Sequence, residues 1–115
     1  MTVVVRDKQL KSALEAPGKL TAKYGAVMAK KIVLRMQSLR SAETLADFWP
    51  PRSGPERCHE LIGDMSGTYS MDLQQPYRLL FKHAAPALIE DGIEGKEKWG
   101  RIRSIDIVGI EDTHG

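Results

Sequence analysis

The sequence predicts an α+β fold, in which helices pack on a twisted antiparallel sheet of about four to five strands. Two observations carry this prediction. The stretch 19–41 contains no proline and repeats its apolar residues at helical spacing. The stretch 57–83 alternates three extended runs with two turn signals. The chain has 115 residues, of which 42% are hydrophobic, so we expect one domain spanning residues 1–115.

The amino-terminal residues predict a short strand followed by a short helix. The run Thr2–Arg6 is rich in β-branched side chains, which favour an extended strand. Asp7 is a suitable N-cap residue for a helix over Leu10–Ala16. Pro17 and Gly18 then end this helix.

The stretch Lys19–Ser41 predicts one long helix, because its only glycine is Gly25. One face of this helix is apolar and packs on the core. The residues of that face are Tyr24, Met28, Ile32, Met36 and Leu39. Lys31 and Arg35 lie beside this face. They either lay their stems along the apolar surface or flank a site or a partner surface.

Ser41–Thr44 predicts the start of a further helical turn. Three residues after it are expected to pack on the core, namely Leu45, Phe48 and Trp49. Pro50 and Pro51 end the turn, and residues 50–56 form a loop that leads to the sheet.

The stretch that follows predicts an antiparallel meander with short loops. Its three strands are Arg57–Ile62, Thr68–Leu73 and Tyr77–His83. The two turns contain Gly63 and Gly67 in one case and Pro76 in the other, residues that favour turn geometry. The meander therefore places polar residues of neighbouring strands close to one another.

The carboxyl-terminal part predicts a loop and a last strand. Residues 84–99 form the loop, whose middle is acidic and contains glycine. Arg101–Ile110 forms the strand, and its apolar pattern shifts register after Ile107. A β-bulge near Gly109 would explain that shift.

Charge is unevenly distributed along the chain. Residues 1–57 contain 11 Lys and Arg against 5 Asp and Glu, whereas residues 58–115 contain 6 against 10. The basic half indicates either a polyanionic partner or a lysine-rich helix surface in water. We find no membrane-length apolar run and no signal peptide. The only cysteine, Cys58, cannot form an intramolecular disulfide, which fits a reducing cytoplasm.

The motifs of several enzyme classes are missing. The sequence has no glycine-rich phosphate loop, no CxxC pair and no HExxH. We therefore expect neither a metal nor a cofactor. The histidines His59, His83 and His114 can each take and give a proton near neutral pH. Two of them with Arg78 would suit RNA cleavage by internal transfer, although each histidine could instead be structural.

Three segments resemble the HigB group of bacterial toxins, in the RelE superfamily. The central motif of that group resembles the segment RCHELIGDMSGTYSMDLQQPYRLLF. The closing Asp-Tyr-His of the group resembles residues 110–114, IEDTH. Its long helix and following turn resemble KYGAVMAKKIVLRMQSLRSAETLADF. The resemblance therefore covers nearly the whole chain.

The resemblance implies a RelE-like fold of the microbial RNase type. It implies a toxin of a type II toxin–antitoxin system that cleaves messenger RNA in the ribosomal A site, without a metal, in the cytoplasm. It also implies neutralisation by a helix-turn-helix antitoxin similar to HigA. We expect no membrane partner.

The resemblance also assigns residues to roles. The catalytic set would be His59, Arg78, Asp112 and His114. Asp112 or His114 would act as the base, His59 as the acid, and Arg78 would stabilise charge on the phosphate. The RNA-binding set would be Tyr69, Tyr77, Lys82, Lys31 and Arg35.

Two departures from the family pattern affect this assignment. Thr113 stands where the family has tyrosine, and threonine cannot stack on a base. Leu61 and Ile62 stand where some relatives carry a basic residue after the first histidine.

Two other functions remain open. One is a non-catalytic binder on the same scaffold, as in the related ParE-like gyrase inhibitors. The other is a basic RNA-binding domain whose histidines are structural. The set of histidines, arginine and aspartate favours the nuclease.

Overall fold

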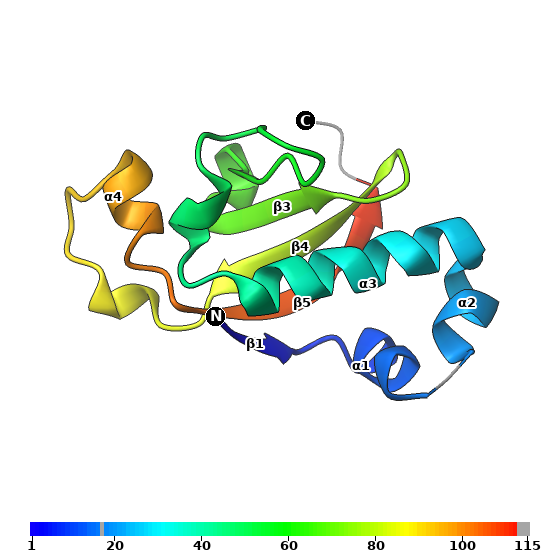
Figure 1. Cartoon of the computed structure of the whole chain (residues 1–115). Coiled ribbons are helices and arrows are strands. Elements are labelled where there is room, and N and C mark those ends of the chain that lie inside the picture. Colours follow the sequence, from blue (N-terminus) through cyan, green and yellow to red (C-terminus); the bar gives the residue numbers. More distant parts are fainter. Residues whose placement is uncertain (17, 113–115) are drawn as a thin grey trace.

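The computed structural model describes residues 1–16 and 18–112 (Figure 1). Within these residues, five strands form one sheet in the order β1-β5-β4-β3-β2. The strands are β1 (Thr2–Val5), β2 (His59–Glu60), β3 (Thr68–Asp72), β4 (Tyr77–His83) and β5 (Ser104–Asp112). β1 runs parallel to β5, and the other neighbouring pairs are antiparallel. The predicted α+β fold is confirmed, with one parallel pair in an otherwise antiparallel sheet.

The helices are short except for one. They are α1 (Lys8–Glu15), α2 (Lys19–Tyr24), α3 (Ala26–Ser41) and α4 (Gly95–Trp99). Three 3₁₀ turns join the elements: η1 (Leu45–Phe48), η2 (Gly63–Met65) and η3 (Pro86–Leu88). The described residues include no helix that is both long enough and apolar enough to cross a bilayer.

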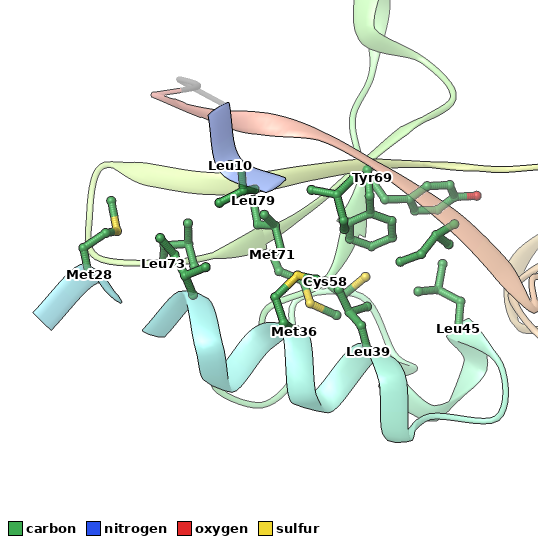
Figure 2. Close-up of a cluster of buried hydrophobic side chains, with 14 of the residues drawn as sticks. Leu10, Met28, Met36, Leu39, Leu45, Cys58, Tyr69, Met71, Leu73 and Leu79 are labelled. Atoms are coloured by element: carbon green, nitrogen blue, oxygen red, sulfur yellow. The ribbon is translucent and has the colours of Figure 1, made fainter. Parts of the chain in front are cut away.

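The core lies between helices α1–α3 and one face of the sheet. Figure 2 shows Met36 and Leu39 of α3 below Met71 and Tyr69 of β3, with Cys58 among them. Side chains alternate along each strand, so Tyr69, Phe81 and Ile107 form one row on this face. We call it the helix face. The opposite side, which we call the polar face, carries Thr68, Ser70, Asp72, Arg78 and Lys82.

The amino-terminal helix has the predicted cap, although it begins at Lys8 rather than at Leu10. The Oδ1 atom of Asp7 accepts a hydrogen bond from the Leu10 amide at 2.9 Å, so Asp7 is the N-cap of α1. Pro17, one of the two residues expected to end this helix, lies outside the described residues.

The single helix predicted over residues 19–41 is wrong. Gly25 has φ 82° and ψ 161°, a conformation that ends α2 and precedes α3. L-amino acids rarely adopt this region, whereas glycine does so without a steric cost. Apolar residues continue at helical spacing on both sides of Gly25, so periodicity alone does not show the break.

The first strand of the meander is shorter than predicted. β3 and β4 match their expected ranges closely, but β2 contains only His59 and Glu60. Arg57 has φ 47° and therefore cannot continue the strand. The loop before β2 is longer than expected as a result.

The loop predicted at 84–99 contains a helix, α4. Trp99 of α4 is buried and packs edge-on against Trp49, with ring centroids 5.1 Å apart. This contact between distant parts of the chain stabilises a helix too short to form alone.

The bulge expected near Gly109 is confirmed. Leu80 pairs with Gly109 whereas Phe81 pairs with Ile107, so Val108 is the extra residue of β5. The strand itself begins at Ser104 rather than Arg101 and extends to Asp112.

Candidate functional site

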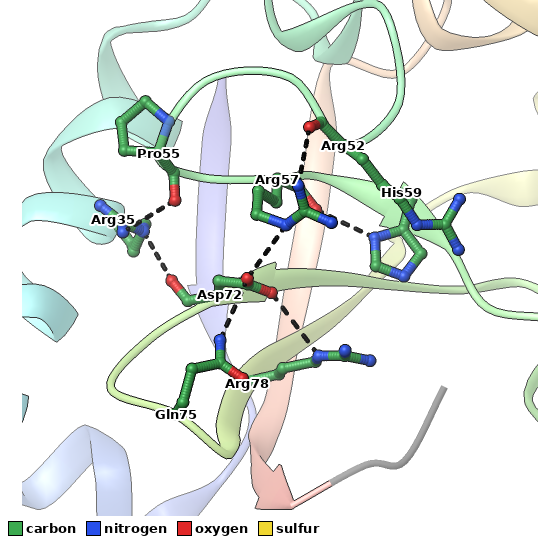
Figure 3. A network of polar contacts seen from close by, with 8 residues as sticks. All are labelled: Arg35, Arg52, Pro55, Arg57, His59, Asp72, Gln75 and Arg78. Atoms are coloured by element: carbon green, nitrogen blue, oxygen red, sulfur yellow. Dashed lines mark hydrogen bonds and ion pairs between the residues drawn. The ribbon is translucent and has the colours of Figure 1, made fainter.

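Asp72, the last residue of β3, brings together two arginines from different segments (Figure 3). Its Oδ2 atom lies 3.3 Å from Arg57 Nε, and its Oδ1 atom lies 3.5 Å from Arg78 Nε. Asp72 is directly opposite Arg78 in the β3–β4 register, so both side chains lie on the polar face. Gln75 also donates a hydrogen bond to Oδ2 at 3.1 Å. One carboxylate therefore orients two guanidinium groups.

The backbone of Asp72 is held equally firmly. Its amide donates to the Glu56 carbonyl at 2.7 Å, and its carbonyl accepts from Arg35 Nε at 2.7 Å. Arg35 Nη2 donates in addition to the Pro55 carbonyl at 3.1 Å. Arg35 of α3 thus fastens the loop before β2 to the end of β3. Its side chain is buried, which is not the exposed position expected of an RNA contact.

His59 of β2 lies next to this cluster. Its Nδ1 atom is 2.9 Å from the Arg57 carbonyl oxygen. A carbonyl oxygen can only accept, so Nδ1 carries the proton, and in the neutral ring Nε2 keeps its lone pair. Nε2 is buried and has no hydrogen-bond partner among the described residues.

The surroundings of His59 keep its ring neutral. Burial lowers the pKa of His59 below its ordinary value, and the positive charges of Arg52 and Arg78 act in the same direction. The hydrogen bond to the Arg57 carbonyl and the charge of Asp72 oppose this shift. A neutral imidazole with an accepting Nε2 suits a general base. The geometry therefore favours the opposite role to the acid assigned from the resemblance.

Two predicted tyrosines do not join this cluster. Tyr69 is buried on the helix face, where its ring stacks on Phe81 with centroids 5.8 Å apart. Burial, reinforced by Glu60, raises the pKa of the Tyr69 phenol. Tyr77 is 44% exposed, but strand alternation puts it on the opposite side of β4 from Arg78.

The predicted lysines are spread out. Lys82 is exposed on the polar face, four residues from Arg78, which corresponds to about 13 Å along a strand. Lys31 is half-buried on α3.

The carboxyl-terminal part of the predicted site is only partly described. Asp112 ends β5 in register with Tyr77, and Glu111 is the residue directly opposite Arg78. His114 and Thr113 lie outside the described residues.

Sequence reasoning missed three residues of the cluster. Asp72 lies inside the predicted strand Thr68–Leu73 and looks like an ordinary alternating polar residue. Arg52 and Arg57 fall where the sequence predicts a loop and the start of a strand. A backbone turn with positive φ at two arginines has no signal in composition or spacing.

Several hollows among the described residues lie away from this cluster. A groove of about 510 Å³ runs between β1, α1 and α3, with Val5, Leu14, Val33 and Met36 among its apolar lining. A cavity of about 340 Å³ lies between the 86–94 segment and the end of the sheet, beside His83. In the described part of the chain, no three His, Cys, Asp or Glu side chains form a group that could hold a metal.

No protein-family model matches this sequence, and no curated protein matches it. Solved structures match its fold. The YoeB/ParE toxin from Agrobacterium tumefaciens superposes with a TM-score of 0.56 at 14% identity, over 99% of this chain and 100% of that one. The YoeB dimer from Staphylococcus aureus gives 0.53 at 15% identity, over 100% and 98%. The YoeB–YefM complex from the same organism gives 0.52 at 15% identity, with the same coverage.

At this level of identity the likeness shows the fold alone. The HigB subgroup remains a prediction. The RelE-like fold predicted from the sequence is confirmed, because this chain has the α+β fold of the YoeB/ParE toxins over its whole length.

Proposed function

We propose that this chain is the toxin of a type II toxin–antitoxin system and acts as a metal-independent, ribosome-dependent endoribonuclease on messenger RNA. One observation carries the proposal. The accepting Nε2 atom of a neutral, buried His59 lies beside the guanidinium of Arg78, which Asp72 orients. A base next to an oriented cation is what internal transfer at a phosphodiester requires.

In the proposed reaction, RNA binding first uncovers His59 Nε2, which is buried in the free protein, and Nε2 then removes the proton of a ribose 2′-hydroxyl. The 2′-oxygen then bonds to the adjacent phosphorus, and the bond from phosphorus to the 5′-oxygen breaks. Arg78 stabilises the negative charge on the phosphate oxygens through charge-assisted hydrogen bonds. The products are a 2′,3′-cyclic phosphate and a 5′-hydroxyl end.

The departing 5′-oxygen needs a proton from a second group. We assign this step to His114, which lies outside the described residues, and we keep Asp112 as a further member of the catalytic set. Lys82 and Lys31 are proposed contacts for the RNA strand beyond the reacting phosphate. We place the activity in the cytoplasm, where ribosomes are found.

The proposed partner is an antitoxin with a helix-turn-helix domain. A separate extended segment of the antitoxin would bind this chain. One similar structure is a YoeB–YefM toxin–antitoxin complex. In this chain, β1 is at the edge of the sheet beside the apolar groove, and the rim carries Lys11 and Arg40 against Glu15. An extended segment with apolar and acidic side chains fits this edge and this rim.

The test uses purified ribosomes carrying a defined message in the A site. We expect the protein to cleave that message and the His59→Gln variant to lose the cleavage by at least about 100-fold, as for loss of a general base. His83→Gln is the matched control. Burial lowers the pKa of His83 too, but His83 is at the end of β4, whereas Arg78 is near its start. An intact message at ample protein, or equal losses in the two variants, would contradict the proposal. Growth arrest with an intact message would favour a gyrase-binding or other non-catalytic toxin instead.

A further inference from the structure

The loop before β2 has an unusual backbone. Arg52 and Arg57 both have positive φ, 63° and 47°, the left-handed region in which residues other than glycine are uncommon. Such conformations cost roughly 1–3 kcal/mol each and persist only where the surroundings enforce them. The surrounding contacts must therefore hold both arginines in this conformation.

Hydrogen bonds enforce this loop at both ends. The Arg52 amide donates to the Cys58 carbonyl at 3.0 Å, and the Arg57 amide donates to the Ser53 carbonyl at 3.2 Å. Ser53 Oγ donates to the Phe48 carbonyl at 3.2 Å. Together with the bonds from Arg35 and Asp72, these contacts fix where both arginines project.

The two arginines differ in what they contact. Arg57 is engaged in the fold: its Nε pairs with Asp72, its Nη1 donates to the Arg52 carbonyl at 3.4 Å, and its own carbonyl accepts from His59. The guanidinium of Arg52 is exposed and has no hydrogen bond or ion pair within the part of the chain that the structure describes. Figure 3 shows it beside the His59 ring, and its charge is close enough to disfavour protonation of that ring.

Two cations therefore flank His59. In Figure 3, Arg78, oriented by Asp72, lies on one side of the ring and Arg52 lies on the other. Arg52 has no carboxylate partner in the described residues. A phosphodiester group carries one negative charge spread over two oxygens, and a guanidinium can bind such oxygens through two parallel hydrogen bonds. The 50–57 loop therefore brings a second guanidinium close to His59.

We propose that Arg52 is a phosphate-binding residue of this site and contacts the RNA backbone opposite Arg78, across His59. The proposal rests on the proposed function and names the part of the substrate that the 50–57 loop recognises. Arg57 is a positioning residue, which holds the loop and the tautomer of His59. The contact is with the phosphate and carries no base preference.

The experiment measures binding separately from cleavage. The probe is a single-stranded RNA oligonucleotide with 2′-O-methyl riboses, which cannot undergo internal transfer, and binding is followed by fluorescence anisotropy at several salt concentrations. Arg52→Asn removes the charge with a residue that tolerates positive φ. Arg101→Gln is the control, because Arg101 is an exposed arginine that pairs with Glu97 near α4.

We expect Arg52→Asn to weaken binding about tenfold and to lower the salt slope by about one, with no change for Arg101→Gln. Arg52→Lys should keep the salt slope of the parent protein. A second readout is the pH titration of the His59 ring by NMR, in which the pKa of His59 rises in Arg52→Asn. Thermal unfolding shows that each variant is folded.

The outcomes separate this proposal from the proposed function. If Arg52→Asn binds the probe with the affinity and salt slope of the parent protein, the role of Arg52 is refuted even where ribosomal cleavage is observed. If the parent protein leaves the message intact but Arg52→Asn still loses probe binding, phosphate binding stands and the nuclease is refuted.

Discussion

Replacing Asp72 by asparagine tests the geometry of the cluster with a minimal change in shape. The variant keeps the size of the side chain and removes the charge that faces Arg57 and Arg78. The backbone bonds of residue 72 to Glu56 and Arg35 do not involve the carboxylate, so the sheet should still form.

The expected loss of stability follows from the exposure of each partner. The Arg57 side chain is 51% exposed, so its ion pair with Asp72 contributes only about 0.2–1 kcal/mol. The side chains of Asp72 and Arg78 are 13% and 16% exposed. Removing one partner of a fully buried pair costs about 3–5 kcal/mol, so this partly buried pair should lose about 2 kcal/mol. For a domain of this size that is a fall in Tm of about 8 °C.

The same change should affect catalysis. Arg78 loses the carboxylate that directs its guanidinium, and a misplaced charge stabilises the transition state less. We expect single-turnover cleavage of ribosome-bound message to fall about 10–100-fold, which corresponds to about 1.4–2.7 kcal/mol of activation free energy. Asp64→Asn is the control, since Asp64 lies exposed in η2. If Asp72→Asn matched Asp64→Asn in both Tm and cleavage rate, the proposed orientation of Arg78 would be wrong.

Two further predictions concern stability. Burial lowers the pKa of His59 and of His83, so the unfolded chain takes up protons first as the pH falls, and the free energy of unfolding should decrease below pH about 6.5. Denaturant titrations between pH 7.5 and 5 should show this dependence of the unfolding free energy on pH, and His59→Gln should reduce it. The same dependence in His59→Gln as in the parent protein would contradict a neutral buried ring. Gly25→Ala should lower the free energy of unfolding by about 1–3 kcal/mol, because φ 82° and ψ 161° strain any residue with a Cβ, although the space there is open; a variant as stable as the parent protein would show that α2 and α3 can join as one helix.

Local signals in the sequence were sufficient for much of the sheet. Strand alternation and turn residues predicted β3 and β4, and the register shift after Ile107 predicted the bulge. The break at Gly25 was missed because the apolar face continues through it. α4 was missed because this short helix is stabilised by the contact of Trp99 with Trp49, which is distant in sequence.

The site was only half predictable for the same reason. The meander places His59 and Arg78 close enough for the charge of Arg78 to lower the pKa of His59, as its strand order indicated. The inward position of Tyr69 could have been found from alternation, since it shares a face with Met71 and Leu73. The positions of Arg52 and Asp72 depend on a loop backbone that only the assembled fold enforces.

The chemistry of the cleaved ends tests the central claim most directly. Messages cut on ribosomes by the parent protein can be analysed by mass spectrometry of the terminal fragments. Catalysis by His59 through the ribose 2′-hydroxyl predicts a 2′,3′-cyclic phosphate, or the 3′-phosphate formed from it, and a 5′-hydroxyl. A 3′-hydroxyl with a 5′-phosphate, or the absence of any cut, would contradict it.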